Sequence, residues 1–589
     1  MRLLRWIGYV IVGLFATIGA LLVIAVVATA LAWRNFMGPT EPVPDRAVLQ
    51  LDLRAGIAET EPYYVPLISD FDRSLTLRDL VETLHAAADD ERVTGLIVRV
   101  NGSGLGLAQI QELRDAIAAF AAAGKPSIAF AETFGETGSG TLDYYLASAF
   151  DEVWLQPSGE LDITGILIEQ PFMRELLTDL GVVPEFAARE NYKSAVEMFT
   201  RDSMSPAHRR NLEQLVNSWK GQIVADIAAG RGLDAAAVVG LIDRAPLDPD
   251  TAFDASLIEG RAYRDEVEMS ALALVGGDAG LYEFADYAWQ VEPPADALPI
   301  ALVYGVGAIH LGTGESGFGG SGDIDADILV GALRKARAVE DVAAVILRID
   351  SPGGSYVASD TIWREVERTR EAGIPVIVSM GNVAASGGYF IAAPASAIVA
   401  DPATVTGSIG VVSGKFVLDD LWADVGIDWD AIGFGANVGI FSPNRPFTEQ
   451  QWQQLNETLD RIYADFLQRV ADGRELDAAA VRASAQGQIW SGEDALERGL
   501  IDELGGLHRA IEVALEEGGH SPDAPYELIT VRGARFGVHN TFEESASLWA
   551  DLRASAILLA EFSRWLAIRQ QLSDGPALLA DPAFSESLR

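Results

Sequence analysis

The chain carries one domain pattern twice, and this duplication constrains its fold more than any other feature. The first copy contains the run GLIVRVNGSG and the second contains AAVILRIDSPGG, each followed by an amphipathic stretch and a second apolar run. Because the repeat period is a whole domain, the sequence predicts two similar domains in tandem and not a solenoid. The matching positions are Arg99 and Arg348, Gly124 and Gly373 (348 − 99 = 373 − 124 = 249), then Tyr144 and Tyr389, Gly165 and Gly410, Gly181 and Gly426 (389 − 144 = 410 − 165 = 426 − 181 = 245).

Within each copy, short apolar runs alternate with amphipathic segments. Val345–Ile349 and Val376–Val378 are continuous apolar runs, as expected for strands buried on both faces of a sheet. Leu105–Ala123 and Tyr356–Ala372 have the spacing of helices. Strands that alternate with helices favour βαβ units around a parallel sheet, so the sequence predicts an α/β fold.

The repeat also sets the expected domain boundaries. Val48–Leu53 is predicted to be the first strand of the first copy, and Ile300–Tyr304 its counterpart after the boundary at Pro293 and Pro294. We therefore expect an anchor over residues 1–34, a linker over 35–45, one domain over 46–290, a second over 297–535 and a helical tail of unknown role over 536–589.

The N-terminus carries a candidate membrane anchor. Trp6 to Trp33 contains no charged residue and exceeds the roughly 20 residues that a transmembrane helix needs. Arg2 and Arg5 precede it, which places the N-terminus in the cytoplasm by the positive-inside rule. A cleaved signal peptide is the alternative, but its apolar core is usually about 7–15 residues long. Either way, the remainder of the chain is expected across the membrane.

Composition excludes several classes of function. The chain has no cysteine, so disulfides and thiol catalysis are absent. It has 85 acidic and 43 basic residues and a formal charge of −42, so we expect no nucleic-acid partner. None of its six histidines lies in a recognisable catalytic or zinc-binding motif, so neither a Ser-His-Asp triad nor a metal site is expected.

One serine lies in a context that suits a nucleophile. Ala384-Ala385-Ser386-Gly387-Gly388 follows a predicted strand, and the small residues allow a sharp turn and close approach of a substrate chain. A following helix would offer unpaired N–H groups that favour developing negative charge. Asp350–Gly354 ends the neighbouring predicted strand, and its glycines could supply further donors to an oxyanion hole.

A serine nucleophile needs a base, and a desolvated lysine can serve. Lys193 lies between apolar neighbours in Asn191–Glu197, where an ordinary surface lysine is the simple alternative. The repeat favours the base, because Ser386 corresponds to Thr141 and Lys193 to Val438 (386 − 141 = 438 − 193 = 245). Each copy thus keeps one half of a possible catalytic pair.

The chain resembles the long, duplicated form of the signal peptide peptidase A family, peptidase family S49, membrane-anchored bacterial serine proteases with a ClpP/crotonase fold. The resemblance covers about nine-tenths of the chain and is weakest in the tail. The motifs that carry it are NYKSA from Asn191, RDSMSP from Arg201, DSPGG from Asp350, AASGGY from Ala384 and TGSIG from Thr406.

The resemblance implies a role for each site residue. Ser386 is the nucleophile, Lys193 the general base, and Ser408 is similar to the family serine that hydrogen-bonds and orients the lysine. The backbone N–H groups of Gly354 and Gly387 are the candidates for the oxyanion hole. No metal or cofactor is needed for the peptide hydrolysis that follows.

The resemblance also implies partners. The substrates would be cleaved hydrophobic signal peptides and other unfolded peptides at the bacterial inner membrane, with the catalytic domains in the periplasm and four copies assembled as a homotetramer. Two alternatives stay open from the residues alone. One is a crotonase-type acyl-CoA enzyme, which the predicted anchor disfavours, and the other is an inactive membrane-tethered scaffold.

Overall fold

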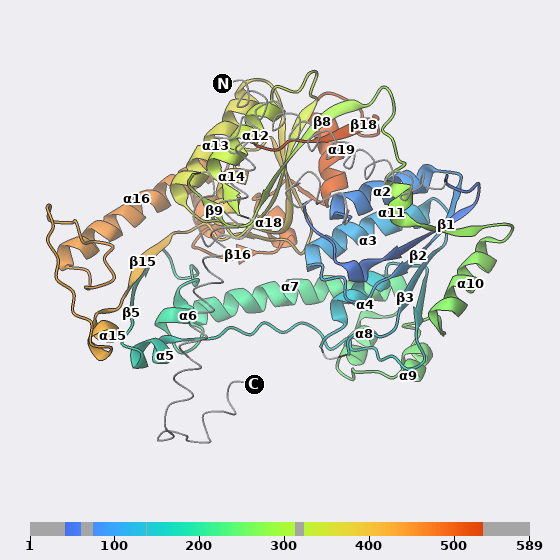
Figure 1. Cartoon of the computed structure of the whole chain (residues 1–589), viewed down its shortest axis with the longest axis horizontal. Helices are drawn as coiled ribbons and strands as arrows, with labels where there is room; N and C mark the ends of the chain where they lie inside the picture. Colours follow the sequence, from blue (N-terminus) through green and yellow to red (C-terminus); the bar gives the residue numbers. More distant parts are fainter. Residues whose placement is uncertain (1–41, 61–74, 137, 313–322, 534–589) are drawn as a thin grey trace, which may run out of the picture.

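The computed structural model describes residues 42–60, 75–136, 138–312 and 323–533 (Figure 1). The expected anchor and the expected tail lie outside these ranges. Within them, no helix combines the length and the apolar character needed to cross a bilayer.

The first half is built on a six-stranded parallel sheet with the order β6-β4-β3-β2-β1-β7. Its strand β1 confirms the run predicted at Val48–Leu53, and β2 is the apolar run of the first repeat. The strands are β1 (Ala47–Asp52), β2 (Val93–Arg99), β3 (Ser127–Ala131), β4 (Glu152–Leu155), β6 (Gly260–Arg261) and β7 (Gly280–Glu283).

The second half has a larger sheet that contains the same six strands in the same order. Its path β18-β8-β11-β12-β13-β17 matches β7-β1-β2-β3-β4-β6 strand by strand, and these strands are again parallel. The predicted duplication is therefore visible in the topology. The strands are β8 (Leu298–Val306), β11 (Ala344–Ser351), β12 (Val376–Ala385), β13 (Ala397–Ala400), β17 (Glu503–Leu504) and β18 (Tyr526–Thr530).

Strand β12 is longer than the three-residue run that the sequence predicted. Its first part pairs with β13, and its last three residues pair with the added strand β14 (Val405–Gly407), which β16 (Ile489–Trp490) extends in antiparallel fashion. This extension carries β12 directly into Ser386. A two-stranded ribbon of β9 (Ile309–His310) and β10 (Ile324–Asp325) lies apart from the main path.

Helices cover both sheets, and the helices predicted from residues 105–123 and 356–372 are confirmed as α3 and α13. In the first half they are η1 (Leu53–Ala55), α2 (Leu77–Asp89), α3 (Leu107–Ala122), α4 (Thr141–Ala147), α5 (Arg174–Asp179), α6 (Glu197–Thr200), α7 (Pro206–Arg231), α8 (Ala235–Ile242), α9 (Pro249–Asp254), α10 (Arg264–Val275) and α11 (Phe284–Ala288). In the second half they are α12 (Ala326–Ala336), α13 (Tyr356–Glu371), α14 (Gly387–Ala392), α15 (Asp419–Asp424), α16 (Glu449–Gly473), α17 (Ala478–Ser484), α18 (Gly492–Glu497) and α19 (Leu507–Glu517).

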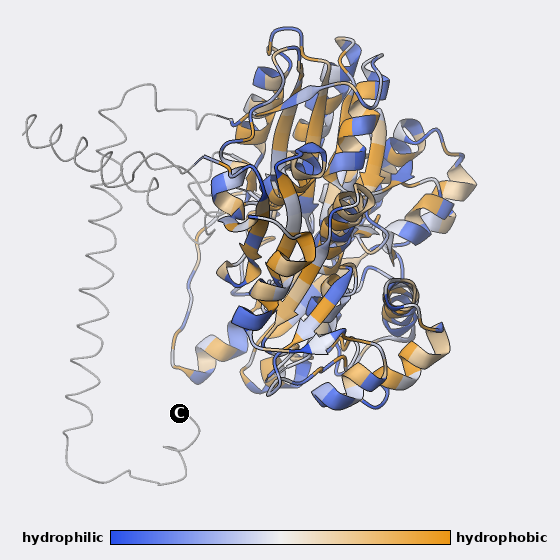
Figure 2. Ribbon diagram, turned by 90° about the vertical axis from the view of Figure 1, so that its right-hand side faces the viewer, coloured by the Kyte–Doolittle hydropathy of each residue, from blue (hydrophilic) through white to orange (hydrophobic). Residues whose placement is uncertain are grey.

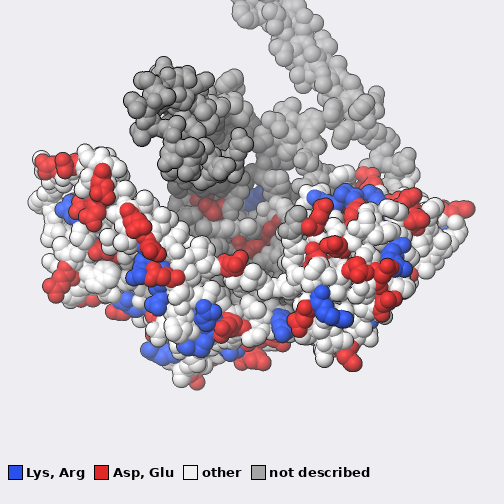
Figure 3. Space-filling model, turned by 90° about the horizontal axis from the view of Figure 1, so that it is seen from below, with Lys and Arg blue, Asp and Glu red and all other residues white. Residues whose placement is uncertain are grey.

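Each half has its own hydrophobic core around its sheet. The largest cluster of the first half joins strands β1 to β4 to helices α2, α3 and α4, and that of the second joins β8, β11 and β12 to α12 and α13. Figure 2 shows the apolar strands inside and the polar faces of the helices outside. On the face shown in Figure 3, acidic and basic side chains are interspersed over the described surface.

A buried ionic cluster joins the two halves. Arg348 on β11 is 1% exposed, and its guanidinium bonds Glu59 at 2.6 Å and Glu112 on α3 at 2.8 Å. Its third partner is the hydroxyl of Ser379 at 2.8 Å. Both carboxylates come from the first half, so a cation of one half neutralises anions of the other out of contact with water.

Each half contributes one strand to a pair that lies outside the two main sheets. We call the segments that contain these two strands the arms of the two halves. Strand β5 (Val183–Ala188) of the first half runs antiparallel to β15 (Val412–Val417) of the second. Helix α7 connects this arm region to the first-half core and passes beneath the second half in Figure 1. It begins at Pro206 in the first turn, after Ser205 caps its N-terminus. The paired arms carry a loop of the first half to the second-half sheet.

Candidate active site

Ser386 lies where β12 turns into α14, half-buried and open to the surface. Its backbone has φ of 55° and ψ of −115°, a conformation that non-glycine residues rarely adopt. The bond from its N–H to the carbonyl of Gly407 at 2.8 Å holds this turn in place. The strain therefore aims the serine side chain away from the strand, as the sequence predicted for a strand-to-helix junction.

Lys193 comes from the loop between β5 and α6 of the other half. Its Nζ is 2.9 Å from Ser386 Oγ, 2.9 Å from Ser408 Oγ and 2.9 Å from the Ser408 carbonyl oxygen. The lysine is 8% exposed, and this desolvation lowers its pKa to about 8. No acidic side chain in the described ranges contributes to that shift. The amine can therefore lose its proton near neutral pH and accept one from the hydroxyl of Ser386.

Glycines let the polypeptide close around the lysine. A Cβ atom on Gly487, whose φ is +75°, would lie 2.5 Å from the backbone nitrogen of Lys193, and one on Gly410 would lie 3.2 Å from its Cδ. Gly487 therefore excludes a larger side chain, and Gly410 admits one only if its neighbours shift. The absence of side chains at these two glycines allows the close packing that removes water from the amine.

Two backbone N–H groups converge beside Ser386. A Cβ on Gly353, at φ +94°, would meet the nitrogen of Gly387 at 2.4 Å, and a Cβ on Gly387 would lie 3.0 Å from the nitrogen of Gly354. Among the described residues, the N–H groups of Gly354 and Gly387 donate to no backbone acceptor. The glycine turn after β11 and the start of α14 thus bring two free donors to the serine, as an oxyanion site requires.

The corresponding place in the first half is closed. Thr141 begins α4 there, and the carboxylate of Asp143 accepts from the N–H of Gly102 at 2.8 Å and from the hydroxyl of Ser103 at 3.1 Å. An anion of the chain itself thus occupies the loop that corresponds to the glycine turn after β11. Val438, the counterpart of Lys193, is exposed. The counterpart of the site at Thr141 therefore has neither a lysine partner nor open donors.

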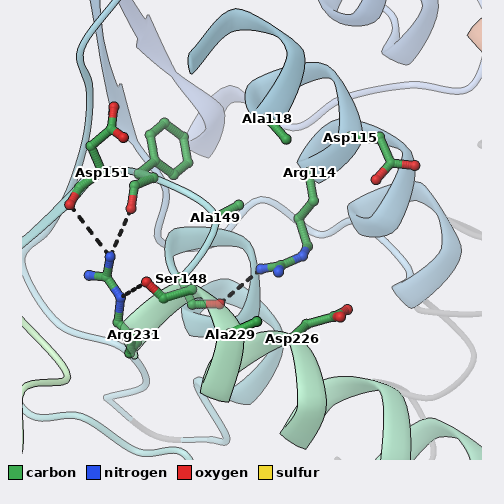
Figure 4. Close-up of a pocket in the computed structure, with 11 residues that line it drawn as sticks. Arg114, Asp115, Ala118, Ser148, Ala149, Asp151, Asp226, Ala229 and Arg231 are labelled. Atoms are coloured by element: carbon green, nitrogen blue, oxygen red, sulfur yellow. Dashed lines mark hydrogen bonds between the residues drawn. The ribbon is translucent and has the colours of Figure 1, made fainter. Parts of the chain in front are cut away.

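A separate cavity of about 510 Å³ lies in the first half, away from Ser386 (Figure 4). Its two arginines are already engaged: Arg114 bonds Ser148 Oγ at 2.8 Å, and Arg231 bonds the carbonyl of Phe150 at 2.9 Å. Asp115 also lines it, and burial raises its pKa to about 6. Nothing in this cavity pairs a nucleophile with a base.

The sequence predictions and the geometry differ in what surrounds the site. The structure brings Ser386, Lys193, Ser408, Gly354 and Gly387 together within one chain. The sequence reasoning missed the segment 486–489, which lies against Lys193 and Ser408. Gly487 between two glutamines was the only local signal, and glycine at a turn is too common to single it out. Within the described ranges, no group of three or more His, Asp or Glu side chains is arranged to hold a metal ion.

The chain is similar to known proteases over most of its length. The model of peptidase family S49 matches residues 119–276 and 368–520. Protease 4 of Haemophilus influenzae is 33% identical over 462 residues, which are 75% of this chain and 73% of that protein. The chloroplastic serine protease SPPA of Arabidopsis thaliana is 30% identical over 491 residues, 82% of this chain and 71% of that protein. Among solved structures, a ClpP1 mutant from Listeria monocytogenes matches 34% of this chain and 90% of its own at 15% identity, with a TM-score of 0.23.

The chain therefore belongs to peptidase family S49, with the family region present twice in a mixed α/β fold. Within that family it is a serine protease of the signal peptide peptidase type, similar over most of its length to the long proteins called Protease 4.

Proposed function

We propose that this protease cleaves peptides with a Ser/Lys dyad whose two members come from different halves of one chain. The observation that carries the proposal is the 2.9 Å contact between Lys193 Nζ and Ser386 Oγ, made by a buried amine with a lowered pKa. At a pKa of about 8, roughly one tenth of the lysine is neutral at pH 7, a sufficient fraction for a general base.

The steps follow from the contacts. Neutral Lys193 takes the proton of Ser386 as Oγ bonds to the scissile carbonyl carbon. The N–H groups of Gly354 and Gly387 stabilise the resulting oxyanion. The C–N bond then breaks while the ammonium of Lys193 gives its proton to the leaving amine, which leaves an acyl-serine. A water molecule, deprotonated by the same lysine, attacks the acyl carbon and restores Ser386. Ser408 accepts from the ammonium and keeps it aimed at Ser386.

The same proposal covers substrate and location. We assign cleaved hydrophobic signal peptides and other unfolded peptides as substrates, with the N-terminal segment anchored in the bacterial inner membrane and the two halves in the periplasm. The supports are the uncharged run from Trp6 to Trp33 and the likeness to the serine protease SPPA. We also assign a ClpP/crotonase-type fold to each half, which the parallel strand order supports.

The repeat supports a homo-oligomer, which we propose to be a homotetramer. At the offset of 245, α5 corresponds to α15, β15 to residues 167–172, and β5 to residues 428–433 (419 − 174 = 412 − 167 = 428 − 183 = 245). Glu190 and Gly435 (435 − 190 = 245), at the same offset, both have positive φ. Strands β5 and β15 pair within the chain, whereas their counterparts lie unpaired among the described residues. Each chain would thus pair its residues 428–433 with residues 167–172 of the next copy.

The deciding experiment is turnover of a hydrophobic signal-like peptide by detergent-purified full-length protein. Ser386→Ala and Lys193→Ala are both expected to lower kcat by about 10⁴-fold or more, because they remove members of one catalytic unit. Ser218→Ala is a matched control: Ser218 on α7 bonds Ser491 and lies outside the dyad.

Equal turnover in wild type and both variants would reject the dyad and favour an inactive scaffold copurified with another protease. Mixing the two inactive variants adds a second readout. Activity that returns only in the mixture would mean that serine and lysine act between chains instead of within one.

A further inference from the structure

One short segment, residues 486–489, bonds the backbone next to Lys193 and the backbone of Ser408. The carbonyl of Gln486 accepts from Tyr192 N–H at 3.2 Å, beside Lys193, and the carbonyl of Gln488 accepts from Ser408 N–H at 2.7 Å. The N–H of Gly487 between them donates to the carbonyl of Ile409 at 2.9 Å. Segment 486–489 therefore sets the position of the lysine and of the serine that orients it.

In the part of the chain that the structure describes, no strand lies along the outer side of this segment. Ile489 pairs with Gly407 in the antiparallel register of β16 on β14, and the bond from Ser408 N–H to Gln488 marks the adjacent position as the bonded one. The N–H and C=O of Ile489 therefore point away from β14. A sheet edge of this kind needs a partner for both groups.

Asn211 supplies that partner from the other half. Its Nδ2 donates to the Ile489 carbonyl at 2.8 Å, and its Oδ1 accepts from the Ile489 N–H at 3.0 Å. It is 4% exposed, on the first part of α7. A carboxamide is the side-chain group that offers a donor and an acceptor side by side, so one residue replaces a strand here.

We infer that Asn211 is a positioning residue for the catalytic pair, acting through segment 486–489; this inference rests on the function proposed above. The physical reason is desolvation. With the outer edge of Ile489 held, Gly487 stays against the backbone of Lys193 and water is kept from its amine. Without Asn211 the segment gains freedom to move outward, the amine is hydrated, and its pKa rises toward the ordinary value of 10.5.

The test is the pH dependence of kcat/KM in the full-length protein. Asn211→Ala and Asn211→Asp are expected to lower kcat at pH 7 by about 10- to 100-fold with little change in KM, since a rise of about one to two units in the pKa of Lys193 leaves that much less neutral amine. In wild type, kcat/KM rises with pH as Lys193 loses its proton, and we call this rise the acid limb of the pH profile. Its midpoint, about pH 8 in wild type, is expected to move to higher pH in both variants. Because the defect lies in the protonation state, part of the activity returns at pH 10.

Gln214→Ala is the matched control. Gln214 lies one turn further along the same face of α7 and bonds the side chain of Gln488 at 3.1 Å, not the backbone of the segment. Its acid limb is expected to stay at the wild-type midpoint. Asn211→Gln keeps both polar groups on a longer stem and is expected to show a smaller shift in the same direction.

Two outcomes are separable from failure of the function itself. An unshifted acid limb in folded Asn211→Ala, with activity lost only in proportion to folded protein by circular dichroism, makes Asn211 merely structural and rejects the inference. If Asn211→Ala does not fold, an unshifted limb in Asn211→Gln rejects it equally. Wild-type turnover that survives Ser386→Ala rejects the dyad instead.

Discussion

At the scale of the residue, the site depends on removing water from one amine. Among the described residues, Lys193 has no carboxylate partner; its amine bonds the hydroxyls of Ser386 and Ser408 and one carbonyl. A carboxylate there would stabilise the ammonium and raise the pKa, whereas burial among neutral groups lowers it. The strained backbone of Ser386 contributes separately by presenting the hydroxyl outside the strand.

The lowered pKa of Lys193 predicts the pH dependence of activity. The protonated amine is inactive, so kcat/KM is expected to rise about tenfold per pH unit below pH 8 and to level off above it, because the pKa is about 8. Initial rates from pH 5 to pH 10 measure this directly. Lys193→Arg, which stays charged throughout, is the control and is expected to be inactive at every pH. A limb centred near pH 6.5 would instead point to a histidine.

At the scale of the element, the pair of strands β5 and β15 delivers the lysine. The register places Gly414 opposite Phe186 across the two halves. A Cβ on Gly414 would lie 2.2 Å from the carbonyl of Glu185, so only glycine allows the strands to approach. Lys193 follows β5 after a few residues. Any separation of β5 from β15 would therefore also displace the amine of Lys193.

Gly414→Ala is therefore expected to reduce kcat/KM by about 10- to 100-fold, as misplacement of a catalytic group by about 1 Å does. Peptide turnover and a thermal melt measure the loss of activity and of stability. Gly221→Ala is the control, since a Cβ on Gly221 in α7 meets nothing within 4 Å. That change is expected to keep activity and to stabilise the helix by about 0.5–1 kcal/mol. Full activity in Gly414→Ala would mean that the arms do not position Lys193.

At the scale of the whole molecule, the duplicated arms are the contact that we propose between copies of the chain. Strand β5 of the first half pairs with β15 of the second half inside the chain. Their repeat counterparts, residues 428–433 and 167–172, pair with no strand among the described residues and expose large apolar side chains. Ile432 is fully exposed and Trp429 is 57% exposed, and on the facing stretch Leu167 is 79% exposed. A contact between two different surfaces repeats from copy to copy and closes into a ring or extends as a fibre.

If the protein forms the homotetramer proposed above, Ile432→Asp is expected to lower the mass of the detergent-solubilised protein from that of four copies to that of one. The reason is that the register of β5 on β15 would place this residue opposite Ile168 of the next copy (432 − 187 = 413 − 168 = 245). Light scattering coupled to size exclusion measures the mass. Leu274→Asp makes the same change at an exposed position on α10 and is expected to leave the mass unchanged. An unaltered mass in Ile432→Asp would exclude this strand pairing as the contact.

The sequence alone determined the α/β class, the duplication and the residue types of the candidate pair. Each is a local or periodic property of the sequence. The signals are apolar runs of strand length, glycine at turns, and the repeat offset at which Ser386 corresponds to Thr141 and Lys193 to Val438. These signals survive without the fold, because backbone propensity and turn chemistry act over a few residues.

Only the tertiary structure decided which groups surround the amine and how the halves meet. Three contacts join residues that are far apart in the chain. Gly487 packs against Lys193, Asn211 bonds the backbone of Ile489, and Arg348 is buried between Glu59 and Glu112. No local pattern marks them, since an asparagine in a helix or an arginine in a strand is ordinary until packing supplies its partner. The pKa of Lys193 is likewise a property of the packed site, because desolvation exists only once both halves have closed around the side chain.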